Sequence, residues 1–214
     1  MAKLLYKDLR LSNLALVALM MSLCLLMLIP AYLLYVGLIY ICLAVFFTQQ
    51  RFREDNDIYF SMLLPIRKRD IVRGHVLTYS VFELAQLVVA VPVAIVRDVF
   101  IAPDNPVGID ANPALFGSAL IMYALFNFVF LTGHYKTAHN LGIPLVLAGT
   151  VLFVYIAIAE VAVQFVPVLK STLDVVGQHW AAQFGVLALG LAVFVLGNVA
   201  TYRVSAARFE RVDL

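Results

Sequence analysis

Two acidic residues, Glu83 and Glu160, lie within long apolar stretches and are the first candidates for chemistry. A carboxylate in lipid is costly, so it normally faces a cavity, a substrate path or a polar partner. For each acid two interpretations therefore remain. It is a polar point on a substrate path, or it reaches water or pairs with a neighbouring side chain. Proton-coupled carriers usually place several ionisable groups near the midplane, and only these two acids are available here, neither of them central.

The chain lacks the sequence patterns of the common enzyme and cofactor sites. It contains no G-x-x-x-x-G-K-[ST], H-E-x-x-H, G-x-S-x-G or paired C-x-x-C pattern. His134 and His139 are five residues apart, a spacing that does not align two metal ligands on one helix face. A membrane-embedded enzyme would need a constellation of His, Asp, Ser or Cys that cannot be assembled from these residues. We therefore expect no catalytic residue, metal or cofactor in this chain.

Composition indicates that the bilayer is the solvent for most of the chain. Hydrophobic residues make up 64% of the sequence and charged residues 13%, too few charges to cover a soluble domain of this size. The formal net charge of +2 is too small for a nucleic-acid partner. Cys24 and Cys42 both lie in apolar stretches and are typical of small buried hydrophobic residues.

The apolar stretches predict an all-α polytopic membrane protein, with residues 1–214 forming one domain. Leu14 to Phe47 carry no charge, but one helix of that length would be roughly 50 Å long, whereas the hydrocarbon layer is about 30 Å thick. Pro30 near the middle predicts a break between two spans. Residues 2–11 predict a short amphipathic helix in the headgroup layer. We expect six spans, at about residues 13–29, 31–48, 72–95, 114–131, 141–165 and 181–202.

The basic residues are distributed unequally between the two sides of these spans. Of the 15 Lys and Arg residues, only Arg97 and Lys170 fall on one side. Segments rich in Lys and Arg remain in the cytoplasm. Both termini are therefore expected inside, in a multi-pass protein of a bacterial cytoplasmic membrane.

The segment 50–71, between the second and third spans, is the main cytoplasmic surface. An acidic group precedes an apolar patch, Pro65 breaks the helix, and a basic group leads into the third span. Apolar residues are not exposed in such a loop unless the membrane surface or a partner protein covers them. A linker that lies on the lipid is the simpler alternative.

Small residues recur along the sixth span at spacings of three and four, at Gly185, Ala188 and Ala192. Small residues at such spacings let helices approach closely. They predict a packing face within the chain or between chains.

The segment 57–72 resembles the loop of bacterial ABC exporter permeases of the type-2 class. A pattern close to Y-x-x-S-L-P-[IV]-x-R-x-x-I-V links spans two and three in that family. The matching residues here are Leu64, Pro65, Ile66, Lys68 or Arg69, Ile71 and Val72, with Tyr59 upstream and Ser61 displaced. Residues 4–11 also resemble the N-terminal Lys-Asp-Leu segment of the family. Where the family often continues with Lys-Tyr, this chain has Gly74-His75.

The resemblance implies a permease dimer, of identical or paralogous chains, above two copies of a separate ABC ATPase subunit that holds ATP and magnesium. Family members export amphipathic peptides, lipids or drugs along a path between protomers, lined largely by spans one, two and five. The loop would be a coupling helix, its acids pairing with the ATPase and its apolar residues filling a groove there. The coupling residues would be Glu54, Asp55, Asp57, Ile58, Tyr59, Phe60, Leu63, Leu64, Pro65, Arg67 and Arg69.

Two other functions remain open from the sequence. A substrate-binding membrane subunit of an ABC-type importer also has six spans and an external ATPase, but the outer loops offer few convergent polar groups for a small molecule. A non-transporting membrane immunity or sensor protein is the other alternative.

Overall fold

The computed structural model describes residues 2–101, 105, 107–175 and 179–212, and every regular element in this part of the chain is a helix. The all-α prediction is therefore confirmed. The helices in chain order are α1 (Ala2–Leu11), α2 (Leu14–Ser22), the 3₁₀ helix η1 (Leu23–Leu28), α3 (Leu34–Glu54), α4 (Asp57–Met62), α5 (Lys68–Phe100), α6 (Pro113–His134), α7 (Gly142–Phe165), α8 (Pro167–Leu173) and α9 (Trp180–Phe209).

Five of the described helices, α3, α5, α6, α7 and α9, are long and apolar enough to cross a membrane. A sixth candidate is the pair formed by α1 and the α2–η1 segment, which is bent by 72°. The α2–η1 segment alone is about 25 Å long at the usual rises per residue, close to the thickness of the hydrocarbon layer. The bend follows from Asn13, whose side chain accepts a hydrogen bond from the amide of Leu16 and starts a new helix.

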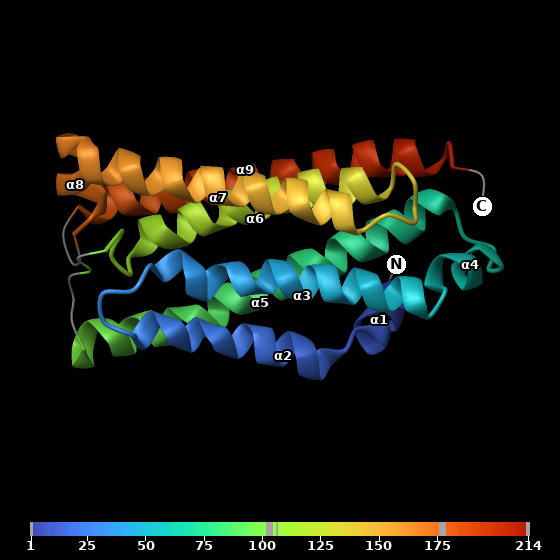
Figure 1. Ribbon diagram of the computed structural model, residues 1–214, viewed down its shortest axis with the longest axis horizontal. Coiled ribbons are helices and arrows are strands. Elements are labelled where there is room, and N and C mark those ends of the chain that lie inside the picture. Colours follow the sequence, from blue (N-terminus) through green and yellow to red (C-terminus); the bar gives the residue numbers. More distant parts are fainter. Residues whose placement is uncertain (1, 102–104, 106, 176–178, 213–214) are drawn as a thin grey trace.

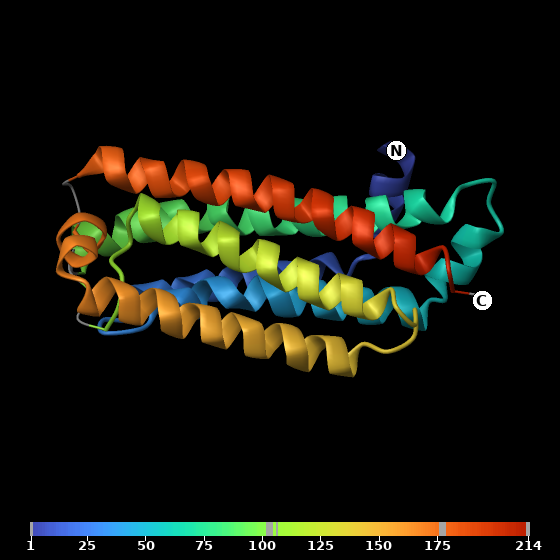
Figure 2. The ribbon, with the colours of Figure 1, turned by 90° about the horizontal axis from the view of Figure 1, so that it is seen from above.

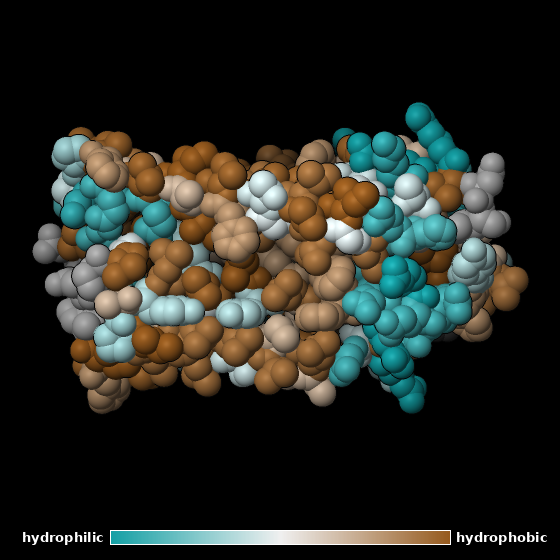
Figure 3. Space-filling view, in the orientation of Figure 1, coloured by the Kyte–Doolittle hydropathy of each residue, from teal (hydrophilic) through white to brown (hydrophobic). Residues whose placement is uncertain are grey.

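Consecutive long helices run in opposite directions along the length of the molecule, so α3, α6 and α9 point one way and α5 and α7 point the other way (Figures 1 and 2). The N-terminus, α4 and the C-terminal end of α9 lie at one end, and α8 lies at the other (Figure 1). Helix α6 is the most enclosed of the five long helices, because α7 and α9 pack against it. On the face drawn in Figure 3, the middle of the molecule is apolar and hydrophilic residues gather near the end that carries α4.

Several helix boundaries differ from those predicted. The third predicted span, 72–95, is a helix of 33 residues, α5, so Arg97 belongs to a helix and not to a polar loop. Arg97 is buried, and its Nη1 donates to the carbonyls of Met27 at 2.6 Å and Ile29 at 3.1 Å. These carbonyls lie where η1 ends and so have no helical partners, which is why the helix tolerates a buried cation there.

The predicted coupling segment 50–71 is also shorter than expected. Helix α3 continues to Glu54 and α5 begins at Lys68, so only the six-residue helix α4 and its connections remain between them. At the other end of the chain, α9 extends to Phe209, beyond the predicted limit of the sixth span at residue 202. The break predicted at Pro30 lies between η1 and α3, where Ala31 has a φ of 52°.

The packing face predicted on the sixth span is wrong for contacts within the chain. Gly185, Ala188 and Ala192 are all exposed on α9. The close approach of α6 and α9 instead uses Gly117 and Gly190: a Cβ added at Gly190 would lie 2.1 Å from the carbonyl oxygen of Gly117. Spacing alone could not separate the two faces, because small residues recur on both.

Replacing Gly190 by alanine is expected to lower the free energy of unfolding by about 1–3 kcal/mol, because the new methyl group must push the α6 and α9 backbones apart. Gly185→Ala is the matched control, since a Cβ there meets no atom within 4 Å, and alanine favours a helix over glycine by about 1 kcal/mol. Denaturant titration of both variants in mixed micelles measures the difference. Equal stability of the two would show that α6 and α9 do not touch at Gly117.

Candidate functional site

Helix α4 has one face turned outward and one turned into the protein. Asn56, at a φ of 51°, reverses the chain after α3 so that α4 begins at Asp57. Tyr59 is 54% exposed and Leu63 84% exposed, four residues apart on one face. We call the exposed apolar residues of this segment the α4 ledge; its members are Tyr59, Phe60, Met62, Leu63 and Leu64.

The residues predicted to contact an ATPase therefore do not share one surface. Asp57 and Ile58 face inward, and Asp57 is only 2% exposed. Glu54 and Asp55 are exposed at the end of α3; Asp55 pairs with Arg51 at 3.0 Å, one turn away. Pro65, Arg67 and Arg69 are exposed in the connection to α5 and at its start.

The basic residues after the ledge connect α5 to the C-terminal segment. The Arg69 guanidinium makes two hydrogen bonds to the Glu210 carboxylate, at 2.5 and 2.9 Å. Lys68 donates to the carbonyl of Val212 at 2.7 Å, and its ammonium lies 5.6 Å from the centre of the Phe209 ring. These contacts place the C-terminal segment against the first turn of α5.

The inward face of α4 meets a buried group of polar side chains that we call the polar junction; its members are Lys7, Asp8, Asp57, Ser61, His75 and Tyr135. Lys7 of α1 donates to Asp57 at 2.7 Å and to Ser61 at 2.8 Å. Its ammonium also lies 3.3 Å from the carboxylate of Asp8. One lysine side chain thus joins α1 to α4.

His75 extends the polar junction into the helix bundle. Its Nε2 lies 3.4 Å from Asp57 Oδ2, and its Nδ1 lies 2.5 Å from the Tyr135 hydroxyl. A carboxylate only accepts, so Nε2 carries a proton that it donates to Asp57. The ring of Phe52 stacks on the imidazole at 4.6 Å. The junction therefore connects α1, α4, α5 and the α6–α7 connection.

The charge of Asp57 is stabilised by its partners. Burial raises the pKa of the Asp57 carboxyl, but the hydrogen bonds and charges of His75 and Lys7 outweigh this and leave that pKa below its usual value. A lowered pKa in the folded state means that the stabilisation is fully present above the usual aspartate range. It is lost only as the pH falls below that range, so Asp57 is ionised at neutral pH.

The dipeptide Gly74-His75, which departs from the family pattern, is explained by the junction. A Cβ at Gly74 would lie 2.6 Å from Asp8 Oδ2, so a larger residue would displace this carboxylate from its position in the junction. Sequence reasoning missed Lys7, Asp8 and His75 as site residues. The sequence signal that could have found them was the adjacent charged pair Lys7-Asp8 in the N-terminal segment. The partner of Lys7, Asp57, lies 50 residues further along the chain.

Three members of the junction have the chemistry of metal ligands. Ligand atoms of Asp8, Asp57 and His75 all lie within 4.8 Å of one another. The Lys7 ammonium, however, lies 2.7 Å from Asp57 and 3.3 Å from Asp8, and so supplies the positive charge that a cation would bring. The arrangement is an ion-paired contact between helices.

The two acids in the apolar stretches have different surroundings. Glu83 is fully buried, and Asn127 donates to it at 2.8 Å while also donating to Asn198 at 3.1 Å. It thus pairs with a neighbour among α5, α6 and α9. Glu160 is half-buried at the other end and accepts from the amide of Ile109 at 3.1 Å.

Residues 3–210 match the sequence model described as "ABC-2 family transporter protein". The chain belongs to the ABC-2 transporter family. It is accordingly a membrane permease subunit of an ABC transporter, and permeases of this family generally work with ATPase subunits. Searches of curated proteins and of solved structures gave no match.

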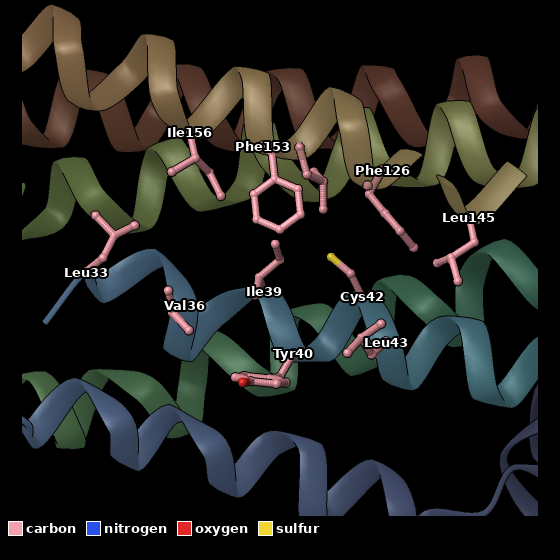
Figure 4. Close-up of a pocket in the computed structure, with 12 residues that line it drawn as sticks. Leu33, Val36, Ile39, Tyr40, Cys42, Leu43, Phe126, Leu145, Phe153 and Ile156 are labelled. Carbon is pink, nitrogen blue, oxygen red and sulfur yellow. The ribbon is translucent and has the colours of Figure 1, made fainter. Parts of the chain in front are cut away.

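An apolar groove of about 310 Å³ opens between α3, α6 and α7 of this ABC-2 permease (Figure 4). Ile39 and Phe153 project towards each other across it from α3 and α7 (Figure 4). Gly149 leaves further space, because no atom lies within 4 Å of where its Cβ would be. The lining is almost entirely carbon surface, which suits an apolar molecule or the apolar part of an amphipathic one. Neither Glu83 nor Glu160 lines this groove.

Asp57→Asn in this ABC-2 permease is expected to lower the free energy of unfolding by about 1–3 kcal/mol, because it removes the nearer of the two carboxylates that face the partly buried Lys7 ammonium and the charged acceptor of His75. Asp55→Asn removes the exposed pair with Arg51 and is expected to change stability by less than about 1 kcal/mol. Denaturant titration in mixed micelles measures both variants. A loss at Asp57 no larger than the loss at Asp55 would contradict the buried ion pair.

Proposed function

We propose that this chain is the permease subunit of an ATP-driven exporter, and that α4 is the coupling helix on which a separate ABC ATPase acts. The observation that carries the proposal is the division of α4: its outer face is the exposed apolar ledge, and its inner face is fastened by the polar junction to α1 and α5. The chain has no catalytic role in this scheme. ATP and magnesium belong to two copies of the ATPase.

The orientation that we propose places the α4 end in the cytoplasm, with both termini inside a bacterial cytoplasmic membrane. The support is the distribution of charge, since basic residues of α1, α3, α5 and the C-terminal segment gather at this end. Segments rich in Lys and Arg are retained in the cytoplasm. Helix α1 would lie in the headgroup layer, as its amphipathic pattern favours.

The route of force follows from the contacts of the junction. Closure of the ATPase pair on bound ATP would push the α4 ledge. Lys7 transmits the displacement to α1, His75 transmits it to α5, and Tyr135 carries it to the α6–α7 connection. Packed helices change position as units, so a small shift at α4 becomes a relative movement of whole spans.

The substrate that we propose is an amphipathic peptide, a lipid or a drug. The groove between α3, α6 and α7 provides an apolar wall of suitable chemistry. Helix α7 leaves most of its apolar surface uncovered in the described chain, and a second permease chain, identical or paralogous, would cover part of it. Gly185, Ala188 and Ala192 give a further small-residue surface on the outside of α9.

Tyr59→Asp combined with Leu63→Asp is expected to abolish the stimulation of the partner ATPase, because two charges replace the apolar surface that the ATPase would bury. The experiment isolates a tagged permease from its native membranes, identifies the co-purifying P-loop ATPase, and measures ATP hydrolysis by the reconstituted complex. Tyr59→Phe with Leu63→Met is the matched control and should retain full stimulation. Both side chains project away from the bundle, so the permease itself is expected to insert and fold normally.

Full stimulation in the aspartate variant would remove α4 from the ATPase interface and overturn the proposal. Absence of any co-purifying ATPase would instead favour a non-transporting membrane protein. Tight binding of a small molecule by the chain alone, without the ATPase, would favour the importer subunit.

A further inference from the structure

A second groove lies between α5 and α9 at the end opposite α4. Its volume is about 460 Å³, and its lining comes from α5, the start of α6 and α9. Helices α5 and α9 diverge towards this end (Figure 1). Its wall is formed by apolar side chains that include Val88, Val91, Ile95 and Phe116. None of these residues belongs to the groove between α3 and α7.

The carboxylate of Asp98 stands at one end of this groove and has no partner among the described residues. One of its oxygens is enclosed and has no hydrogen bond, and no ion pair is formed by Asp98 among the described residues. The neighbouring Arg97 does not neutralise it by contact, since its guanidinium binds the carbonyls of Met27 and Ile29. A carboxylate beside lipid is retained at a high free-energy cost unless a donor or a cation meets it.

Two aromatic rings of α9 line the same groove. The rings of Trp180 and Phe184 stack with their centres 5.8 Å apart, and both side chains are about half exposed. Tryptophan favours the headgroup level of a membrane, and the faces of such rings attract cations. The acid and the aromatic pair together make this end of the groove favourable for a positively charged headgroup.

The depth of the groove matches one leaflet of a bilayer. Its α5 wall extends from Leu87 to Asp98, which is about 16 Å along a helix and about half of the 30 Å hydrocarbon layer. An acyl chain that starts at the level of Asp98 would therefore be covered along the length of its leaflet. A second permease chain or a peptide in this groove would not require an acid at the headgroup level, so the position of Asp98 favours a lipid as the occupant.

We propose that the α5–α9 groove binds one phospholipid with a primary ammonium headgroup, of the phosphatidylethanolamine class. The ammonium donates to Asp98 beside Trp180, and one acyl chain lies against Val88, Val91 and Ile95. A quaternary ammonium cannot donate a hydrogen bond to the carboxylate, and an anionic headgroup is repelled by it. The order of affinity is therefore phosphatidylethanolamine, then phosphatidylcholine, then phosphatidylglycerol.

Native mass spectrometry of the purified full-length permease, with the three lipids carrying identical acyl chains, tests this order. We expect about ten-fold tighter binding of phosphatidylethanolamine than of phosphatidylcholine, the size of a charge-assisted hydrogen bond. Asp98→Asn should abolish the preference and leave the chain folded, since the two side chains have the same shape. Asp55→Asn, which removes an acid at the opposite end, should keep it.

A second variant tests the groove independently of the charge. Val91→Trp fills the groove and should weaken the most tightly held lipid whatever its headgroup, while circular dichroism verifies the helix content. Equal binding of phosphatidylethanolamine and phosphatidylcholine by the unaltered chain, or a preference that persists in Asp98→Asn, would overturn the proposal. Neither result depends on whether an ATPase acts at α4.

Discussion

The ion pair between the partly buried Lys7 and the buried Asp57 is the interaction on which the α4 end of this permease depends. Removing a carboxylate from water costs several kcal/mol, and the attraction of a cation offsets this only when further hydrogen bonds complete the site. Ser61 and His75 supply those bonds here. Since a six-residue helix such as α4 is not stable by itself, its orientation is imposed by this inner face.

That orientation decides which side chains remain exposed. With Asp57 and Ser61 held inward one turn apart, Tyr59 and Leu63 must project outward one turn apart. The exposed ledge is thus a consequence of the ion pair and not a separate feature. A displacement of the ledge would be passed to the side chains that hold the opposite face, Lys7 and His75. The proposed coupling requires such a connection between the ledge and the bundle.

Local sequence patterns predicted the helices well and the contacts between them poorly. The apolar runs predicted the five long helices and the bent sixth candidate, and Pro65 lies in the connection between α4 and α5. Patterns within a segment could not reveal that Lys7 finds Asp57, or that Glu83 finds Asn127, because these partners lie 50 and 44 residues apart. The inward position of Asp57 was within reach, since its spacing from Ser61 places both on one helix face. The burial of Arg97 could not be predicted, because its acceptors are backbone carbonyls left without helical partners where η1 ends.

The two grooves and the polar junction share the same helices, which limits what any ligand can do. His75 joins the junction to α5, a wall of the α5–α9 groove, while Tyr135 joins it to the connection that begins α7, a wall of the other groove. In the proposed coupling, a shift of α4 would therefore move one wall of each groove. A molecule in either groove can favour one position of α4 only by the difference in its affinity for the two arrangements. A lipid held at Asp98 contacts both α5 and α9, so its contacts change whenever α5 moves relative to α9. Such a lipid would bias the transport cycle without lying on the substrate path.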